Sequence, residues 1–189
     1  EVPSADPESG YRLGEWQPSV SREAYEQAVA AIKAAIARGE TYQVNYTYRL
    51  RAGFLGDPWR LFHDLVRNQP AGLAAFLDLG RYVICSVSPE LFFRRDGRRV
   101  VSRPMKGTVG RGRWPDEDDQ RADWLRRSEK NRAENLMIVD MVRNDLGRIA
   151  DLGAVRVPSL FDVEKYPTVW QMTSTVSAET DAPLSGVLA

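Results

Sequence analysis

Four β-rich segments follow one another between residues 72 and 105, with room only for turns between them. They are residues 72–79, 81–88, 90–96 and 98–105. The last two are separated by Asp96-Gly97, and an Asp-Gly pair between two strands is a strong hairpin signal. Helical patterns lie on both sides of this block. The sequence therefore predicts an α+β fold of antiparallel sheets with helices packed outside, rather than a doubly wound parallel sheet.

Regular patterns continue on both sides of this block. Apolar residues at helical spacing predict a helix that starts after an N-cap at Ser21 and ends near Gly39. Residues 1–20 have no period and are expected to be a linker or lead-in. We further expect a strand at 41–52, a helix from Pro58 to about Asn68, a mobile segment at 107–115, one long helix at 117–146, strands at 153–166 and 168–179, and no regular structure in the last ten residues.

Composition excludes several classes of protein. Lys and Arg total 26 and Asp and Glu total 26, so the basic excess typical of nucleic-acid binders is absent. No apolar run reaches the roughly 18 residues of a membrane span. The single cysteine, Cys85, and the single histidine, His63, exclude an internal disulfide and a His- or Cys-rich metal site. We expect Cys85 to be a buried thiol, and the absence of a signal-peptide pattern predicts a cytoplasmic location.

A carboxylate and an amine are candidates for catalysis. Glu90 follows a Ser-Pro turn, and Lys106 lies sixteen positions later in PMKGT, between a strand and a Gly-Thr pair. The two strands between them can form one hairpin, which would bring both residues to the same end of a sheet. An acid beside an amine suits acid/base and nucleophilic chemistry. The alternative is an ordinary edge-strand salt bridge, which contributes roughly 0–1 kcal/mol.

The predicted long helix carries two further acids near its apolar face. Glu134 and Asp145 share this face with Ile138 and Met141. A carboxylate at the margin of a buried face must be paired, protonated or bound to a cation such as magnesium. Residues alone leave two readings open: a metal site, or pairing of the two acids with nearby Arg and Lys residues.

Five motifs of this chain resemble those of the chorismate-utilising enzymes. They occur in the family's order, at residues 39–50, 88–93, 103–108, 133–148 and 168–176. Within the family the chain looks most like aminodeoxychorismate synthase component I. The resemblance implies that residues 21–189 are the middle portion of the family's chorismate-binding, anthranilate-synthase-like domain, and that the C-terminal part of the catalytic domain lies outside this sequence.

The resemblance also assigns roles to residues. Lys106 would be the nucleophile that attacks ring carbon 2 of chorismate, and Glu90 the general acid/base that protonates the departing hydroxyl. Glu134 matches a ligand of Mg²⁺, which holds the substrate's ring carboxylate. Gly107 and Thr108 match a backbone turn that lines the substrate pocket. The implied product is 4-amino-4-deoxychorismate, a precursor of p-aminobenzoate and so of folate, with ammonia from a glutamine amidotransferase subunit as partner.

Two residues bear on the subfamily. Lys106 stands where anthranilate synthases usually carry alanine, and Gln171 stands where many relatives have a histidine used in pyruvate elimination. Both favour chorismate amination over the alternatives, which are anthranilate or isochorismate synthesis, or a non-catalytic fragment that binds chorismate-like anions or a partner. The family's substrate arginine and second metal glutamate are not in this sequence, so we expect the isolated chain to have little or no turnover.

Overall fold

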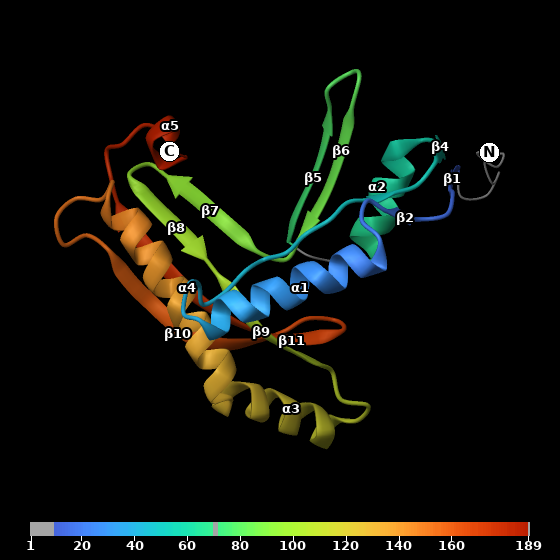
Figure 1. The fold of residues 1–189 in the computed structure, drawn as a ribbon. Coiled ribbons are helices and arrows are strands. Elements are labelled where there is room, and N and C mark those ends of the chain that lie inside the picture. The colour runs from blue at the N-terminus through green and yellow to red at the C-terminus, as the bar shows by residue number, and fades with distance from the viewer. Residues whose placement is uncertain (1–9, 70–71, 189) are drawn as a thin grey trace. The chain divides into compact units, whose positions relative to one another are not determined.

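The computed structural model describes residues 10–69 and 72–188, and it combines helices with antiparallel sheets (Figure 1). The α+β class expected from the sequence is confirmed. Within the described residues, contacts divide the chain into two compact units. The first contains residues 10–64 and 80–83, and the second contains residues 65–69, 72–79 and 84–188.

The helix after Ser21 forms as predicted. Helix α1 runs from Arg22 to Ala37, and the Ser21 side chain accepts a hydrogen bond from the Ala24 backbone N–H at 3.1 Å. Gly39 follows the helix end with a φ of +73°, a left-handed conformation that glycine adopts without steric cost. The signals at both ends are local in sequence, which is why they could be read without the tertiary structure.

The strand expected at 41–52 is mostly wrong. Only Leu50–Arg51 (β3) is a strand, and it pairs with Gln17–Pro18 (β2). The alternating β-rich residues before Leu50 fit a pleated surface, but a strand also needs a hydrogen-bonded neighbour. Within the described residues no strand pairs with 41–49.

The described part of the expected lead-in, residues 10–20, contains short strands. Tyr11–Leu13 (β1) pairs antiparallel with Phe54–Gly56 (β4), and β2 pairs with β3. Residues 1–9 of the expected lead-in lie outside the described residues. The predicted helix from Pro58 is confirmed as α2, Pro58–Asn68.

The β-rich block forms two hairpins. Strands β5 (Leu73–Asp78) and β6 (Val83–Ser88) make a two-stranded sheet. Strands β7 (Leu91–Asp96) and β8 (Arg99–Arg103) pair antiparallel across the predicted Asp-Gly turn. Gly97 in this turn has a φ of +57°, which explains why glycine suits it.

A five-stranded antiparallel sheet forms the framework of the second unit. Its order is β10–β11–β8–β7, and β9 also pairs with β11. The strands not yet bounded are β9 (Met105–Gly110), β10 (Arg156–Lys165) and β11 (Val169–Glu179). The mobile segment expected at 107–115 is therefore wrong for its first half, because β11 offers β9 a ladder partner that the local sequence does not reveal.

The single long helix expected at 117–146 is two helices. Helix α3 covers Pro115–Arg127, α4 covers Glu129–Gly147, and Ser128 between them is extended. Both helices bury side chains on the sheet, Leu125 from α3 and Asn135 from α4. At 100° per residue a continuous helix would turn these two side chains about 80° apart, so the break lets both reach the sheet. The C-terminal residues, expected to be irregular, hold a short helix α5, Leu184–Val187.

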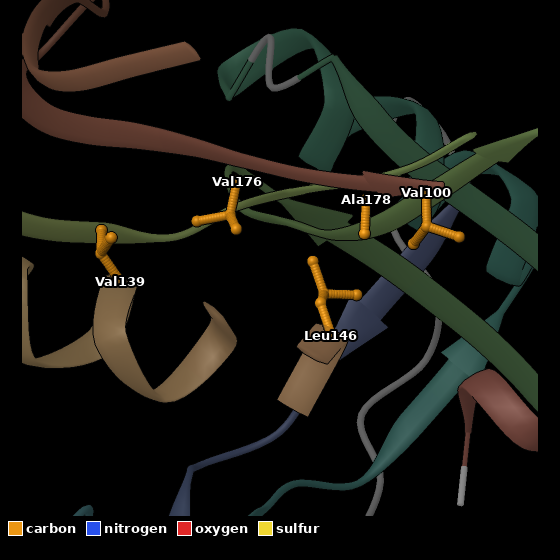
Figure 2. Close-up of a cluster of buried hydrophobic side chains, with 5 residues drawn as sticks. All are labelled: Val100, Val139, Leu146, Val176 and Ala178. Atoms are coloured by element: carbon orange, nitrogen blue, oxygen red, sulfur yellow. The ribbon is translucent and has the colours of Figure 1, made fainter. Parts of the chain in front are cut away.

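The main hydrophobic core lies between α4 and the large sheet. It consists of Val139 and Leu146 from α4, Val100 from β8, and Val176 and Ala178 from β11 (Figure 2). Helix α4, in orange in Figure 1, contacts β9, β10 and β11. One face of the sheet is therefore buried by helix, and this leaves its other face to carry polar groups. Within the described residues, no helix has the length and apolarity needed to cross a membrane.

Candidate active site

Glu90 and Lys106 lie together at one end of the β7–β8 hairpin. The Lys106 Nζ is 3.9 Å from the Glu90 Oε1. The antiparallel register pairs Leu91 with Arg103, so the residue before β7 and the residues after β8 meet at the same end. The expected proximity of these two side chains is confirmed, whereas their catalytic roles remain predictions.

The turn before β7 fixes the position of Glu90. The Glu90 backbone N–H donates to the Ser88 Oγ at 3.2 Å, and the Ser88 hydroxyl donates back to the Glu90 carbonyl at 3.3 Å. The Glu90 carboxylate in turn accepts a hydrogen bond from the Met105 backbone N–H at 3.0 Å. The carboxylate is thus held by the backbone of the strand that carries Lys106.

The Lys106 amine is partly buried and has two oxygen neighbours. Its side chain is 26% exposed, and Nζ donates to the Met105 carbonyl at 3.0 Å. The 3.9 Å contact with Glu90, whose side chain is 42% exposed, is an ion pair without a hydrogen bond. Such a pair contributes roughly 0–1 kcal/mol, so the amine can leave the carboxylate at little cost.

Gly107 lies where β9 packs closely against the helices. Its φ is +101°, and a Cβ built on it would be 3.1 Å from the Asn131 Cβ, 3.2 Å from the Met172 Cβ and 3.3 Å from the Leu125 Cδ1. Asn131 belongs to α4 and Leu125 to α3. Gly107 therefore turns toward the helices and allows their close approach, while its expected role in the substrate pocket remains a prediction.

Thr108 and Gln171 face each other across β9 and β11. They are register partners, and the Thr108 hydroxyl donates to the Gln171 Oε1 at 2.7 Å. Because successive side chains of a strand alternate between faces, Thr108 lies on the face opposite that of Gly107, away from α3 and α4. The residue that replaces the family's histidine therefore contacts a residue expected to bind substrate.

The sheet face away from the helices is polar. Glu164 is the register partner of Gln171 on its other side, and its carboxylate accepts hydrogen bonds from the Thr173 hydroxyl and the Arg103 guanidinium. This face, the open face below, combines hydroxyl, amide and charged groups in the same sheet as Lys106. Such a surface suits a small polar anion better than an apolar ligand.

Glu134 is apart from the Glu90–Lys106 pair. Its carboxylate on α4 is 38% exposed and lies 3.8 Å from the Lys130 Nζ. This agrees with the pairing that the sequence left open as the alternative to a metal. Within residues 10–69 and 72–188, no group of three or more His, Cys, Asp or Glu side chains is placed to hold a metal ion. The described residues therefore offer magnesium no cluster of three such ligands here.

Asn135 is a residue of the site region that sequence reasoning missed. Its side chain is fully buried, and its amide donates to the carbonyls of Lys106 and Met172. One signal in the sequence could have found it: Asn135 is an amide beside Glu134 on a helix expected to pack on a core. A buried amide must find hydrogen-bond partners, so its position indicates contacts with neighbouring elements.

A second missed cluster surrounds Asp118. Its carboxylate accepts hydrogen bonds from the Arg111 guanidinium, from the Gly112 N–H at 2.9 Å and from the Trp170 Nε1–H at 2.9 Å. The Arg111 hydrogen bonds are the main reason that the pKa of Asp118 lies well below its usual range. The cluster ties the start of α3 to β11 directly beside Gln171. In the sequence, Asp118 stands within the acidic run 116–119, and charges of this kind are common at a helix N-terminus, so the run does not indicate these partners.

Two hollows flank the large sheet. The larger, about 790 Å³, contains Arg103, Arg126 and Arg132 in its lining, and each of these cations is already engaged by a carboxylate or an aromatic ring. The smaller, about 110 Å³, has Pro89 and Gln171 in its wall and so adjoins the candidate site. The residues around Glu90 and Lys106 are the better candidate for chemistry.

The single cysteine is not part of this site. Cys85 lies on β6 and is half-buried, and burial raises the pKa of its thiol. A raised pKa keeps the thiol protonated, which disfavours a nucleophilic role. The burial expected for Cys85 is thus only partial.

Comparison with known proteins gives consistent matches. Residues 1–187 match a family described as chorismate binding enzyme. The chain is 41% identical over 174 residues to aminodeoxychorismate synthase component 1 of Escherichia coli (strain K12), covering 92% of this chain and 38% of that protein. It is also 41% identical over 175 residues to anthranilate synthase component 1 of Thermus thermophilus, covering 91% of this chain and 38% of that protein.

A solved structure supports the fold. The crystal structure of anthranilate synthase component I from Streptococcus pneumoniae superposes with a TM-score of 0.83 at 27% sequence identity, covering 92% of this chain and 38% of that chain. The chain thus spans less than two fifths of the length of these relatives.

Proposed function

Because the chain belongs to the family of chorismate-binding enzymes, we propose that, within its complete protein, it aminates chorismate as an aminodeoxychorismate synthase component 1 does. The observation that carries the proposal is the Lys106 amine 3.9 Å from the Glu90 carboxylate, because Lys106 stands where the resemblance places alanine in anthranilate synthases. The reaction would convert chorismate and ammonia into 4-amino-4-deoxychorismate and water.

Lys106 would act as the nucleophile in two balanced steps. Its neutral amine attacks ring carbon 2, the two conjugated ring double bonds each shift by one position, and the bond between carbon 4 and its hydroxyl breaks. Ammonia then attacks carbon 4, both double bonds shift back, and the bond between Lys106 and carbon 2 breaks. The protons lost by the lysine amine and by ammonia balance those taken up by the departing hydroxyl and the departing lysine. A covalent intermediate divides one difficult displacement into two easier ones.

Glu90 would supply the proton that the departing hydroxyl needs. Hydroxide is a poor leaving group, so protonation as the bond breaks lowers the barrier. The Met105 N–H holds the Glu90 carboxylate 3.0 Å away, and this fixes the acid relative to the strand that presents the nucleophile. Support for the role comes from this arrangement and from the short reach between acid and amine.

Thr108 would contact the substrate from the open face. Chorismate carries two carboxylates, and a hydroxyl in a polar surface can donate to one of them. Thr108 donates to Gln171 in this structure, so substrate binding would exchange one acceptor for another. Gly107 would contribute only its backbone, because its Cα hydrogens face the helices.

Glu134 would supply one carboxylate ligand to Mg²⁺. A single, partly exposed carboxylate with a distant lysine partner is available for this, but it does not by itself make a magnesium site. A bound magnesium ion would orient an anionic substrate. The steps assigned above to Lys106 and Glu90 do not depend on it.

A partner subunit is part of the proposal. The name of the Escherichia coli relative, component 1, implies a second component for that protein. We expect the corresponding partner here to be a glutamine amidotransferase that delivers ammonia. A cytoplasmic reaction that leads to p-aminobenzoate and folate completes the proposed function.

The second candidate is anthranilate synthesis, and the observation that favours it is the 41% identity to the Thermus thermophilus enzyme. Anthranilate synthesis releases pyruvate, whereas the proposed amination does not. Isochorismate synthesis would use water in place of ammonia. Incubating the complete protein with chorismate, ammonium and magnesium, and identifying the product by chromatography, separates these reactions. A product other than 4-amino-4-deoxychorismate refutes the proposal.

The nucleophile is tested without ammonia. In the complete protein with chorismate and magnesium, an adduct of dehydrated chorismate should accumulate on the tryptic peptide that contains Lys106. Lys106→Arg should form none, because a guanidinium stays protonated. Lys33→Arg is the matched control and should form the adduct normally. An adduct on another lysine, or none under conditions of turnover, contradicts the assignment.

A further inference from the structure

Strand β9 contains a bulge at the residue proposed as nucleophile. Thr108 pairs with Gln171 and Met105 pairs with Thr173, so three steps along β9 match two along β11. Lys106 and Gly107 therefore lie opposite the single residue Met172. A bulge leaves an extra residue outside the regular ladder and changes the direction of the side chains around it.

The side chain of Asn135 binds both strands at this bulge. Its Nδ2 donates to the Lys106 carbonyl at 3.4 Å and to the Met172 carbonyl at 3.3 Å. Its Oδ1 accepts a hydrogen bond from the Ser174 hydroxyl at 2.6 Å. The Asn135 side chain is 0% exposed. The N–H groups of one buried amide thus donate to a carbonyl of each of the two strands at the bulge.

From this geometry we infer that Asn135 is a positioning residue that maintains the bulge and so aims the Lys106 amine at Glu90. The inference rests on the proposed function of Lys106. The amide of Asn135 gives the two bulge carbonyls a hydrogen bond from outside the ladder. Without it these carbonyls would be buried with fewer donors, which costs free energy that a change of register can recover.

A change of register here would disassemble the acid–amine pair. In a regular ladder from Thr108, Lys106 rather than Met105 would lie opposite Thr173. A shift by one residue exchanges the two faces of a strand. It would move the Met105 N–H away from the Glu90 carboxylate and the Lys106 amine away from its present position. Asn135 therefore acts on chemistry through Lys106 without touching the substrate.

The test compares Asn135→Leu with Thr180→Val in the complete enzyme. Thr180 is also fully buried, and its hydroxyl donates to the Ile149 carbonyl and accepts from the Ala182 N–H, beyond the far end of β11. Both substitutions remove a buried polar group that binds backbone. Thermal unfolding measures the folded fraction, and all rates are given per folded enzyme.

Asn135→Leu should lower kcat and the rate of adduct formation on Lys106 by about 100-fold, the effect of misplacing a reacting group by roughly 1 Å. The KM for chorismate should stay within about twofold, because the substrate contacts are unchanged. Thr180→Val should lower the unfolding temperature but leave kcat within about twofold. Equal losses of kcat in both variants, or a folded Asn135→Leu with the wild-type kcat, overturn the inference.

Two further measurements cover other outcomes. If Asn135→Leu does not fold, Ser174→Ala removes the hydrogen bond to the Oδ1, together with the one that the Ser174 Oγ accepts from the Phe161 N–H at 3.0 Å. A kcat reduced several-fold supports the inference, and an unchanged kcat overturns it. Acetylation of the amines without substrate, read as the labelling ratio of Lys106 to Lys33, should change at least about threefold in Asn135→Leu. This ratio reports the position of Lys106 even if the wild-type enzyme forms no adduct. The absence of an adduct would refute the proposed function, but it would not refute the positioning of Lys106 by Asn135. An unchanged ratio overturns the positioning.

Discussion

Replacing Gly107 with alanine should destabilise the second unit strongly. Its φ of +101° is a conformation that side chains rarely adopt, and its new Cβ would meet atoms at 3.1, 3.2 and 3.3 Å. Two of these are Cβ atoms of Asn131 and Met172, which cannot move without their backbones. Only the third contact, with the Leu125 Cδ1, can be relieved by a side-chain rotation, so most of the strain remains.

The expected cost has two parts. A non-glycine residue in a sparsely populated backbone region costs about 1–3 kcal/mol. Forcing a methyl group into a packed interior costs about 1–3 kcal/mol more. Together they predict that Gly107→Ala lowers the free energy of unfolding by about 2–6 kcal/mol. The turnover should fall as well, because Lys106 and Thr108 flank the substitution.

Gly97→Ala is the matched control. Gly97 also has a positive φ, +57°, but an added Cβ there would meet nothing within 4 Å. It should cost only the backbone strain, about 1–2 kcal/mol. Urea unfolding of wild type and both variants, followed by circular dichroism, gives the three free energies. If Gly107→Ala destabilises no more than Gly97→Ala, the close packing of β9 against the helices does not constrain this position as argued.

Two other substitutions give distinct expectations. Asp118→Asn should lower the unfolding temperature, because Arg111 and Trp170 lose a charged acceptor. The pKa of this carboxyl is lower in the folded than in the unfolded protein, so its stabilisation is complete above the unfolded pKa and is lost as the pH falls through the folded pKa. In thermal melts, the difference in unfolding temperature from wild type should therefore narrow only below about pH 4. A difference that is as large at pH 2 as at pH 7 contradicts this reasoning. Glu134→Gln should cut the activity of the complete enzyme, with partial recovery at high magnesium. It should change the stability little, because the ion pair of Glu134 with Lys130, at 3.8 Å, is solvent-exposed and therefore weak. Unfolding of this variant with a normal magnesium dependence would instead show that the contact with Lys130 is structural.

Local signals in the sequence determined several elements directly. The cap at Ser21, the glycine at Gly39 and the Asp96-Gly97 turn each specify a conformation through neighbours a few residues away. The proximity of Glu90 and Lys106 followed from the same kind of signal, because a tight turn fixes the register of its hairpin and so the residues at its open end.

Tertiary packing decided where several strands and helices form, which the local sequence did not indicate. Strand β9 forms because β11 pairs with it, although most of it was expected to be mobile. The β-rich pattern at 41–49 has no ladder partner among the described residues and is not a strand. The break at Ser128 allows both α3 and α4 to bury side chains on one sheet. In each case a local preference was too weak to decide, and hydrogen bonding or burial against a distant segment determined the result.

The buried polar side chains show most clearly which features only the tertiary structure decides. In the sequence, Asp118 lies in an acidic run and Asn135 lies next to Glu134, the candidate metal ligand. Neither position indicates which groups form hydrogen bonds with these side chains. Their partners, Arg111 and Trp170 for one and the carbonyls of Lys106 and Met172 for the other, include groups 37 to 52 positions away along the chain. A buried polar side chain is stable only where its hydrogen bonds are satisfied, and only the folded arrangement of strands and helices supplies those groups.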